Sequence, residues 1–470
     1  MDKNKLYFIT GSQDLYGEAV LRTVARNAQE VVEGLNSSHA ISAEIVWQPT
    51  VRTAAEIINA IRAANCDDDC IGVICWMHTF SPAKMWINGL KLLQKPLLHF
   101  ATQHNQLLPW ESIDMDFMNL NQAAHGDREF GYICTRLDLP RKVVVGFWRD
   151  PAALAEIDVW TRAAAGLREA KTLRVARLGD NMRDVAVTEG DKVSAQIEFG
   201  FTVNTYGVGD AVEFIRSVAD REVDQLVKEY AELYCVKAKS AAAAAAIREA
   251  ARQEIGLRAF LASVGAKAFT TTFEDLHGLA QLPGLAAQRL MADGFGFGAE
   301  GDWKTAAMLR IAKVMAAGRK GGTSFMEDYT YHLEAGRERV LGSHMLEVCP
   351  SIAAGKPSLE VHALGIGGKG DPARLVFDSP AGPALNASLI DLGDRFRLIV
   401  NQVEAVKPDR KLPKLPVART VWVPKPDFHT GVRSWIEAGG AHHAVYSQAL
   451  EVGHLIDFAE LTGIECVVIG

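Results

Sequence analysis

The period of the hydrophobic pattern changes at about Gly321, and this change constrains the fold more than any other feature. Before it, short apolar runs such as Leu6–Thr10 alternate with amphipathic stretches of helical period such as Glu18–Gly34. After it, apolar residues alternate in short segments separated by Gly, Pro and Asp turns. Strands separated by helices pair in parallel, whereas short alternating segments form antiparallel sheets or barrels. We therefore expect an α/β chain with two doubly wound, Rossmann-like or flavodoxin-like βα domains and a C-terminal, mostly antiparallel β-barrel domain.

The length of 470 residues exceeds what one hydrophobic core usually serves. We place the domains at 1–170, 171–320 and 321–470. In the first, the pattern predicts one helix over Met115–Tyr132. In the second, the alanine run Ala241–Ala246 is interpreted as part of a helix, because alanine is the best helix former.

Composition excludes several classes of protein. The formal net charge of -7 argues against a nucleic-acid surface, and no run approaches the roughly 20 apolar residues of a membrane span. The charged start, Met1–Leu6, does not resemble a signal peptide. The spacing of Cys66, Cys70 and Cys75 fits no zinc motif, which favours reduced thiols. These features predict a cytoplasmic protein.

The glycine-flanked turn Gly11–Gly17, with the sequence GSQDLYG, follows the first expected strand. It lacks the third glycine and the acidic ribose ligand of a dinucleotide-binding motif. It nevertheless lies at the carboxyl end of a strand, which is where open α/β sheets bind ligands.

Two glutamates lie beside glycines and among apolar side chains. Glu300 occurs in GFGFGAEGDWKTAA and Glu327 in GGTSFMEDYTYH. A single glutamate is most often a solvated surface acid. Here the neighbours Phe297, Trp303 and Phe325 favour burial, and buried carboxylates need a metal ion or a partner.

Histidines supply further candidate ligands in the same half of the chain. His344 lies on an alternating segment, and His442 and His443 follow a Gly-Gly pair. A lone histidine is more often a core or surface residue than a ligand, but two acids together with these histidines favour a metal site. Mixed oxygen and imidazole ligands suit Mn²⁺, with Co²⁺ or Mg²⁺ as substitutes. The candidates are too far apart in sequence for spacing to establish the site.

Motifs along most of the chain resemble those of the L-arabinose isomerase family. They include GSQDLYG, TFSPAKMWINGL, DMDFMNLNQAAHGDREFG, TTTFEDLHGLAQLPGLA, GAEGDWKTAA, GGTSFMEDYTYHLE, LGSHMLEVCPSIA and GGAHHAVYS. Because they spread from Gly11 to Ser447, the resemblance is global rather than confined to one motif.

This resemblance implies a set of site residues. The metal would be held by Glu300, Glu327, His344 and His443, with the two glutamates also catalytic. The sugar would contact Gln13, Met182, Phe273, Ile366 and His442. His125 would reach the active site of a neighbouring subunit in a homo-oligomer that is trimer-based and is expected to be a hexamer.

The implied reaction is aldose–ketose isomerisation of L-arabinose to L-ribulose, with D-galactose to D-tagatose as a side activity. A divalent ion stabilises the enediolate, and the glutamates relay protons. An L-fucose isomerase-type enzyme is the alternative within enzymes, although the local motifs match the arabinose family. A periplasmic sugar-binding protein is a third hypothesis; it would require a signal peptide and no metal site.

Overall fold

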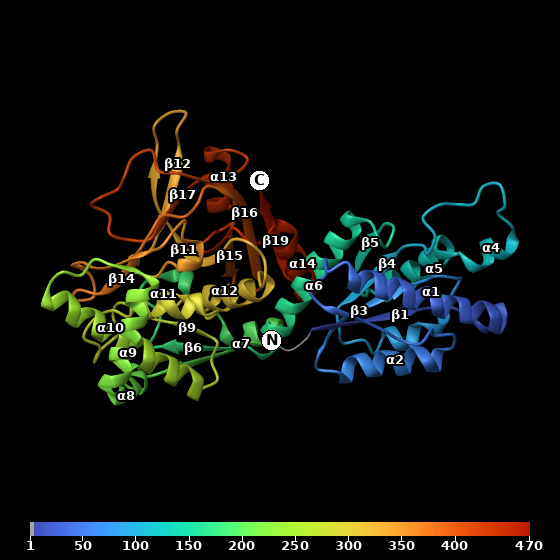
Figure 1. Cartoon of the computed structure of the whole chain (residues 1–470), viewed down its shortest axis with the longest axis horizontal. Helices are drawn as coiled ribbons and strands as arrows, with labels where there is room; N and C mark the ends of the chain where they lie inside the picture. The colour runs from blue at the N-terminus through green and yellow to red at the C-terminus, as the bar shows by residue number, and fades with distance from the viewer. Residues whose placement is uncertain (1–3) are drawn as a thin grey trace. The chain divides into compact units, whose positions relative to one another are not determined.

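The computed structural model describes residues 4–470, which form two compact units. Unit 1 extends to Arg168, and unit 2 covers Glu169–Gly470. The predicted fold class is confirmed, because two parallel sheets with helices are accompanied by a closed, mostly antiparallel barrel (Figure 1). The domain boundaries 1–170, 171–320 and 321–470 remain predictions.

Unit 1 is built on a five-stranded parallel sheet in the order β2-β1-β3-β4-β5, the flavodoxin-like order. The central strand β3 is buried along its whole length, as expected of a strand covered by helices on both faces. The strands are β1 (Lys5–Thr10), β2 (Glu44–Trp47), β3 (Cys70–Trp76), β4 (Leu97–Ala101) and β5 (Lys142–Val145). The main helices are α1 (Gly17–Ser37), α2 (Ala54–Cys66), α5 (Ala123–Arg136) and α6 (Pro151–Thr172), which runs into unit 2.

The single helix predicted over Met115–Tyr132 is wrong. The segment forms two helices, α4 (Met115–Leu120) and α5, separated at Asn121. The Asn121 side-chain amide donates to the carbonyl oxygen of Phe117 at 3.0 Å, and its backbone leaves the helical region. Asparagine side chains compete in this way with the backbone donors that would continue a helix.

Unit 2 begins with a four-stranded parallel sheet in the order β10-β9-β6-β7. Its strands are β6 (Arg174–Leu178), β7 (Thr202–Tyr206), β9 (Ala268–Thr270) and β10 (Gly296–Gly298). The longest helix of this part, α10 (Ala241–Ser263), contains the alanine run as predicted, and the Ser240 side chain caps its start. The other main helices are α7 (Lys192–Phe199), α8 (Val208–Ser217), α9 (Asp220–Leu233), α11 (Gly284–Ala292) and α12 (Trp303–Met315).

The barrel follows the order β15-β18-β11-β12-β17-β16 and closes through pairing of β15 with β16. Its last strand, β19 (Glu465–Ile469), pairs in parallel with β16. The barrel strands are β11 (Thr323–His332), β12 (Arg339–Ser343), β15 (Gly382–Asp391), β16 (Phe396–Val406), β17 (Arg419–Pro424) and β18 (His443–Ser447). Helices α13 (Phe428–Glu437) and α14 (Val452–Thr462) accompany it, and β8 (Cys235–Val236), β13 (Ser358–Val361) and β14 (Ala373–Val376) form a small separate sheet.

Helix α12 lies between the parallel sheet of unit 2 and the barrel, and it contacts β9 and β10 as well as β11, β15 and β18 (Figure 1). Glycines on one face of β10 permit this packing. A Cβ atom on Gly296 would lie 2.0 Å from the Ala306 carbonyl oxygen, and one on Gly298 would lie 2.0 Å from that of Asp302. The alternation of glycine and phenylalanine in GFGFG thus gives β10 a flat face toward α12.

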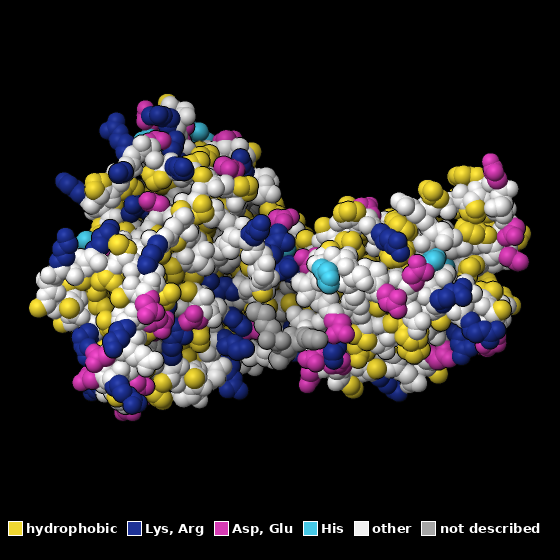
Figure 2. All heavy atoms as spheres, viewed as in Figure 1, with side chains coloured by type: hydrophobic (Ala, Val, Ile, Leu, Met, Phe, Trp, Pro, Cys, Tyr) yellow, Lys and Arg dark blue, Asp and Glu magenta, His cyan; other side chains and the backbone are white. Residues whose placement is uncertain are grey.

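The visible surface of both units carries basic and acidic side chains in mixed positions rather than in one block of either sign (Figure 2). This agrees with the modest net charge of -7. Within residues 4–470, no helix combines the length and apolar character needed to cross a membrane.

The close approach of β10 and α12 predicts that Gly298→Ala destabilises unit 2. The added methyl would collide with backbone and cost about 1–3 kcal/mol, so we expect the thermal unfolding midpoint to fall by about 5 °C. The matched control is Gly209→Ala in helix α8, where a Cβ atom would meet nothing within 4 Å. Equal midpoints for the two variants in differential scanning calorimetry would contradict this account.

Candidate metal and active site

Glu300 lies in the tight turn between β10 and α12, with its backbone in the left-handed region at φ 56°. Gly301 follows at φ 80°, and a Cβ atom there would lie 2.5 Å from the Cα atom of Asn181. The turn is held by hydrogen bonds from the Gly301 amide to Thr271 and from the Met182 amide to the Glu300 carbonyl. A left-handed non-glycine residue is strained, and such strain is common at functional sites.

The register of the barrel brings the other candidate ligands together. Glu327 on β11 pairs opposite His443 on β18 and opposite Ser343 on β12, so that His344 follows directly. Cross-strand partners on one face lie about 5 Å apart, so this register places the Glu327 side chain beside His443. The Glu327 carboxylate also interacts electrostatically with His344. The Phe325 ring packs edge-on against both imidazoles, with centroid distances of 5.1 Å to His344 and 4.9 Å to His443.

Glu300, His344 and His443 each present a ligand atom, and these three atoms lie within 4.8 Å of one another. They come from the β10–α12 turn, the end of β12 and the start of β18. The spacing suits one shared ion, because ligand atoms about 2.0–2.6 Å from a metal lie within about 5 Å of each other. Glu327 is not part of this triad, although its charge acts on His344 and Glu300. Its predicted role as a ligand remains a prediction.

Each triad histidine is oriented by a buried carboxylate. His443 Nδ1 lies 3.1 Å from Asp302 Oδ2, and His344 Nδ1 lies 2.6 Å from Glu347 Oε2. These contacts leave Nε2 as the available ligand atom of each ring. His443 Nε2 is buried without a hydrogen-bond partner and lies 3.9 Å from Glu300 Oε2. An unpartnered imidazole nitrogen facing a carboxylate is the arrangement that a divalent ion would complete, so the residues fit a metal.

The two glutamates have pKa values shifted in opposite directions. Burial opposes ionisation of Glu300, but the hydrogen bond with His442 and the charges of nearby histidines lower its pKa below the usual value. Burial raises the pKa of Glu327, and the negative charges of Glu300 and Glu347 add to this effect. Two carboxylates in such contrasting environments are suited to different tasks in proton transfer.

The pKa values of the three histidines are also shifted in different directions. Burial would lower the pKa of His344, but the Glu347 carboxylate outweighs it and raises the pKa above its usual value. Burial lowers the pKa of His443 despite its bond to Asp302. His442 Nε2 lies 3.3 Å from Glu300 Oε2, and this hydrogen bond raises its pKa.

The pKa of Asp302 falls to about 2, because Lys304, His443 and Thr305 together outweigh the effect of burial. An ionised Asp302 accepts the Nδ1 proton of His443.

The predicted sugar contacts divide into those beside the triad and those elsewhere. A small pocket at the triad is lined by Phe273, Glu300 and His344, and Met182 hydrogen-bonds to the Glu300 backbone. His442 contacts Glu300 directly. Ile366, in contrast, is 40% exposed in the loop between β13 and β14.

Two further predicted contacts belong to unit 1. Gln13 precedes the short 3-10 helix Asp14–Tyr16, and His125 is exposed on α5 with its ring 4.4 Å from that of Phe80. All triad atoms belong to unit 2.

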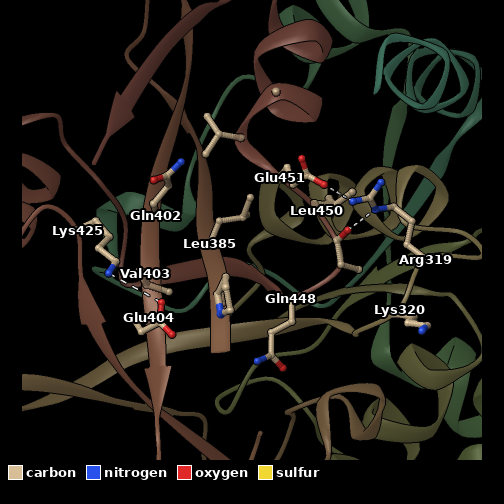
Figure 3. A pocket seen from close by; sticks show the side chains of 15 residues that line it. Arg319, Lys320, Leu385, Gln402, Val403, Glu404, Lys425, Gln448, Leu450 and Glu451 are labelled. Carbon is tan, nitrogen blue, oxygen red and sulfur yellow. Dashed lines mark hydrogen bonds and ion pairs between the residues drawn. The ribbon is translucent and has the colours of Figure 1, made fainter. Parts of the chain in front are cut away.

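A wider surface hollow lies beside strands β15 and β16 and contains none of the predicted site residues (Figure 3). Several of its charged side chains already have partners. Arg319 donates to the Ala449 carbonyl oxygen and pairs with Glu451, and Lys425 lies 3.9 Å from Glu404. Among the described residues, potential metal-ligand atoms converge at the triad and not in this hollow.

Sequence reasoning missed the orienting carboxylates Asp302 and Glu347. Both were signalled by short spacings, because Asp302 follows Glu300 by two positions and Glu347 follows His344 by three. Ligating histidines usually donate their second nitrogen to such a carboxylate, so acids beside each candidate ligand were the signal.

Comparison with known proteins relates nearly the whole chain to one family of proteins. Family models described as the L-arabinose isomerase N-terminal, central and C-terminal domains match residues 1–172, 174–318 and 322–465. An L-arabinose isomerase of Geobacillus stearothermophilus is 58% identical over 99% of this chain and 94% of that protein. Those of Koribacter versatilis and Thermotoga neapolitana are 57% and 56% identical, over 100% and 99% of this chain and 94% of each relative.

The histidine environments predict how metal affinity depends on pH. Imidazole must lose its proton to bind a metal, and the pKa of His344 is raised, so affinity should fall as pH drops through a range above about 6.5. Glu347→Gln removes the carboxylate that holds this proton, so the loss should move to lower pH. Calorimetric Mn²⁺ titrations from about pH 8 to about pH 5 measure both effects; equal affinity across this range would contradict the assignment.

Proposed function

The chain belongs to the L-arabinose isomerase family, and on that premise we propose that it converts L-arabinose to L-ribulose in arabinose catabolism. D-galactose to D-tagatose is the side activity that we propose with it. The observation that carries the proposal is the triad of Glu300, His344 and His443 with Glu327 beside it. Seven free cysteines fit the reducing cytoplasm in which we place the enzyme.

Glu300, Glu327, His344 and His443 would hold Mn²⁺, with Co²⁺ or Mg²⁺ as substitutes, because the donor set mixes carboxylate oxygens with neutral imidazole. Such an ion, when bound, would supply Lewis-acid stabilisation of the negative charge that develops on the sugar during isomerisation. The orphaned Nε2 atom of His443 supports this role.

The chemistry left to the side chains is proton transfer. Isomerisation removes a proton from C2 of the aldose, returns one to C1 and moves another between O1 and O2. Glu327, whose pKa is raised, is suited to carry the proton between the two carbons. Glu300 remains ionised and holds His442 at 3.3 Å.

The remaining residues position the sugar. Phe273 offers an apolar wall beside His344, with a ring-centroid distance of 6.0 Å. Met182 lies at the Glu300 turn, and Gln13, Ile366 and His442 complete the proposed sugar contacts.

The proton-transfer roles predict that Glu300→Gln and Glu327→Gln each reduce kcat at least 100-fold, about the contribution of one general acid–base. An amide neither relays a proton at neutral pH nor ligates well. The control is Glu334→Gln, an exposed glutamate after the same strand β11, which should retain full activity. Ketose formation from L-arabinose is measured with Mn²⁺ binding determined separately. A variant that binds Mn²⁺ and keeps more than about a tenth of kcat would refute that residue's role.

We also propose a homo-oligomer based on trimers, a hexamer, in which His125 reaches the active site of a neighbouring subunit. His125 lies on α5 in unit 1, and the segment before this helix exposes large apolar side chains (Figure 2). Trp110 is 80% exposed and Leu107 79% exposed. Exposed apolar clusters commonly mark protein interfaces, and head-to-tail contacts close into rings.

Subunit mixing tests this shared site. Inactive His125→Ala chains combined with inactive Glu300→Gln chains should form some sites in which both residues are intact, and part of the activity should return. Verified mixed oligomers without recovered activity would exclude the arrangement, as would a fully active monomer by light scattering. Mixing two preparations of the Glu300→Gln variant is the control, which should recover nothing.

A further inference from the structure

Behind each carboxylate that orients a triad histidine lies a fully buried cationic side chain. Lys304 is 1% exposed near Asp302, and Arg374 is 2% exposed near Glu347. Buried cations are rare because desolvation is costly, and they persist where neighbouring charges and hydrogen bonds compensate. Neither residue contacts a triad atom directly, so their burial calls for an explanation outside ligation.

Lys304 connects two segments at the start of α12. Its Nζ atom donates to the carbonyl oxygens of Thr188 and Glu189, and it lies 3.7 Å from Asp302 Oδ1. Asp302 in turn caps the helix by accepting from the Thr305 amide at 3.1 Å. The ammonium group therefore holds the 188–189 segment and the Asp302 carboxylate in one arrangement, from which Asp302 reaches His443.

Arg374 holds the backbone near His344 in a similar way. It lies on β14 and donates through its guanidinium to the carbonyl oxygen of Met345 at 3.2 Å and to that of His362 at 2.9 Å. Met345 lies inside the short turn that joins His344 to Glu347. The guanidinium charge also acts on the Glu347 carboxylate. Arg374 thus fixes both the backbone and the charge of the turn that orients His344.

We propose that Lys304 and Arg374 are paired positioning residues, which act through Asp302 and Glu347 to hold His443 and His344 in the orientation that binds a divalent ion. The inference rests on the proposed function insofar as it requires the triad to bind such an ion. It adds two residues, one behind each histidine, that are not among the proposed ligands or sugar contacts. Removal of either cation leaves a buried carboxylate without its compensating charge and frees the backbone that the cation holds.

The test compares Lys304→Met and Arg374→Met in the full-length protein, with Mn²⁺ as the probe in calorimetric titration of the metal-free protein. Each should weaken Mn²⁺ binding about tenfold, the lower end of what loss of an outer-shell partner costs. Arg374→Lys retains the charge but not the forked contact with the Met345 and His362 carbonyl oxygens, so it should recover part of the affinity and bind more tightly than Arg374→Met. Because a removed positive charge by itself would strengthen cation binding, unchanged or tighter Mn²⁺ binding in both Met variants would overturn the inference.

Double mutants separate positioning from general loss of structure. If each cation acts through its carboxylate, adding Lys304→Met to Asp302→Asn, or Arg374→Met to Glu347→Gln, should weaken Mn²⁺ binding no further. Fully additive weakening in both pairs would also overturn the inference. The matched control is Arg289→Met, because Arg289 pairs with Glu254 and Glu229 rather than with a site residue. It should lower the unfolding temperature but leave the Mn²⁺ dissociation constant within about twofold of wild type.

The outcomes also distinguish this inference from the proposed function. Wild-type protein that binds no Mn²⁺, or that forms no ketose, would end the proposed function itself. Wild-type protein that binds Mn²⁺ and isomerises, together with Met variants of unchanged affinity, would end only the positioning role. If one Met variant does not fold, the other cation and its double mutant still decide the question.

Discussion

The Asp302 carboxylate is the interaction on which the rest of the site depends. It caps α12 by accepting from the Thr305 amide and lies within ion-pair distance of Lys304. It also accepts a hydrogen bond from His443 on barrel strand β18. One side chain therefore fixes a helix start, a buried cation and a candidate ligand. Its pKa of about 2 keeps this carboxylate ionised near neutrality, so that it can accept the Nδ1 proton of His443.

The register of β11 is the second constraint. A slip of one residue would turn Glu327 to the opposite face and remove it from His443, since side chains alternate along a strand. Closure of the barrel through β15 and β16 resists such a slip, because β11 itself is paired on both sides, with β18 and with β12, along part of its length. The packing of α12 against both β10 and β11 then brings Glu300, from outside the barrel, to the histidines within it.

Much of the fold could be predicted from the sequence, and the features that could not be predicted have physical causes. The change of period near Gly321 predicted the change from parallel sheets to barrel. The single helix over Met115–Tyr132 was wrong because the Asn121 side chain acts locally, against an otherwise helical pattern.

The pairing of His344 with Glu347, and of His443 with Asp302, depends on rotamers and on register, which periodicity does not reveal. The small sheet of β8, β13 and β14 was not predicted, because it depends on pairing between distant parts of the chain. Local alternation indicated strands near β13 and β14, but the two-residue β8 lies more than 100 positions earlier in the chain, so no local pattern predicts that they share one sheet.

The backbone of Glu300 shows how fold and function meet in one residue. A left-handed conformation costs a non-glycine residue about 1 kcal/mol or more, and glycine at this position would relieve that cost. Glycine, however, has no carboxylate to present to His443. The surrounding turn offsets the strain with two backbone hydrogen bonds, to Thr271 and from Met182, and with Gly301, which accommodates the close approach of Asn181. A strained acid thus stands between Ala299 and Gly301 where stability alone would favour glycine, and a carboxylate held at such a cost is best explained by the ion that it would bind.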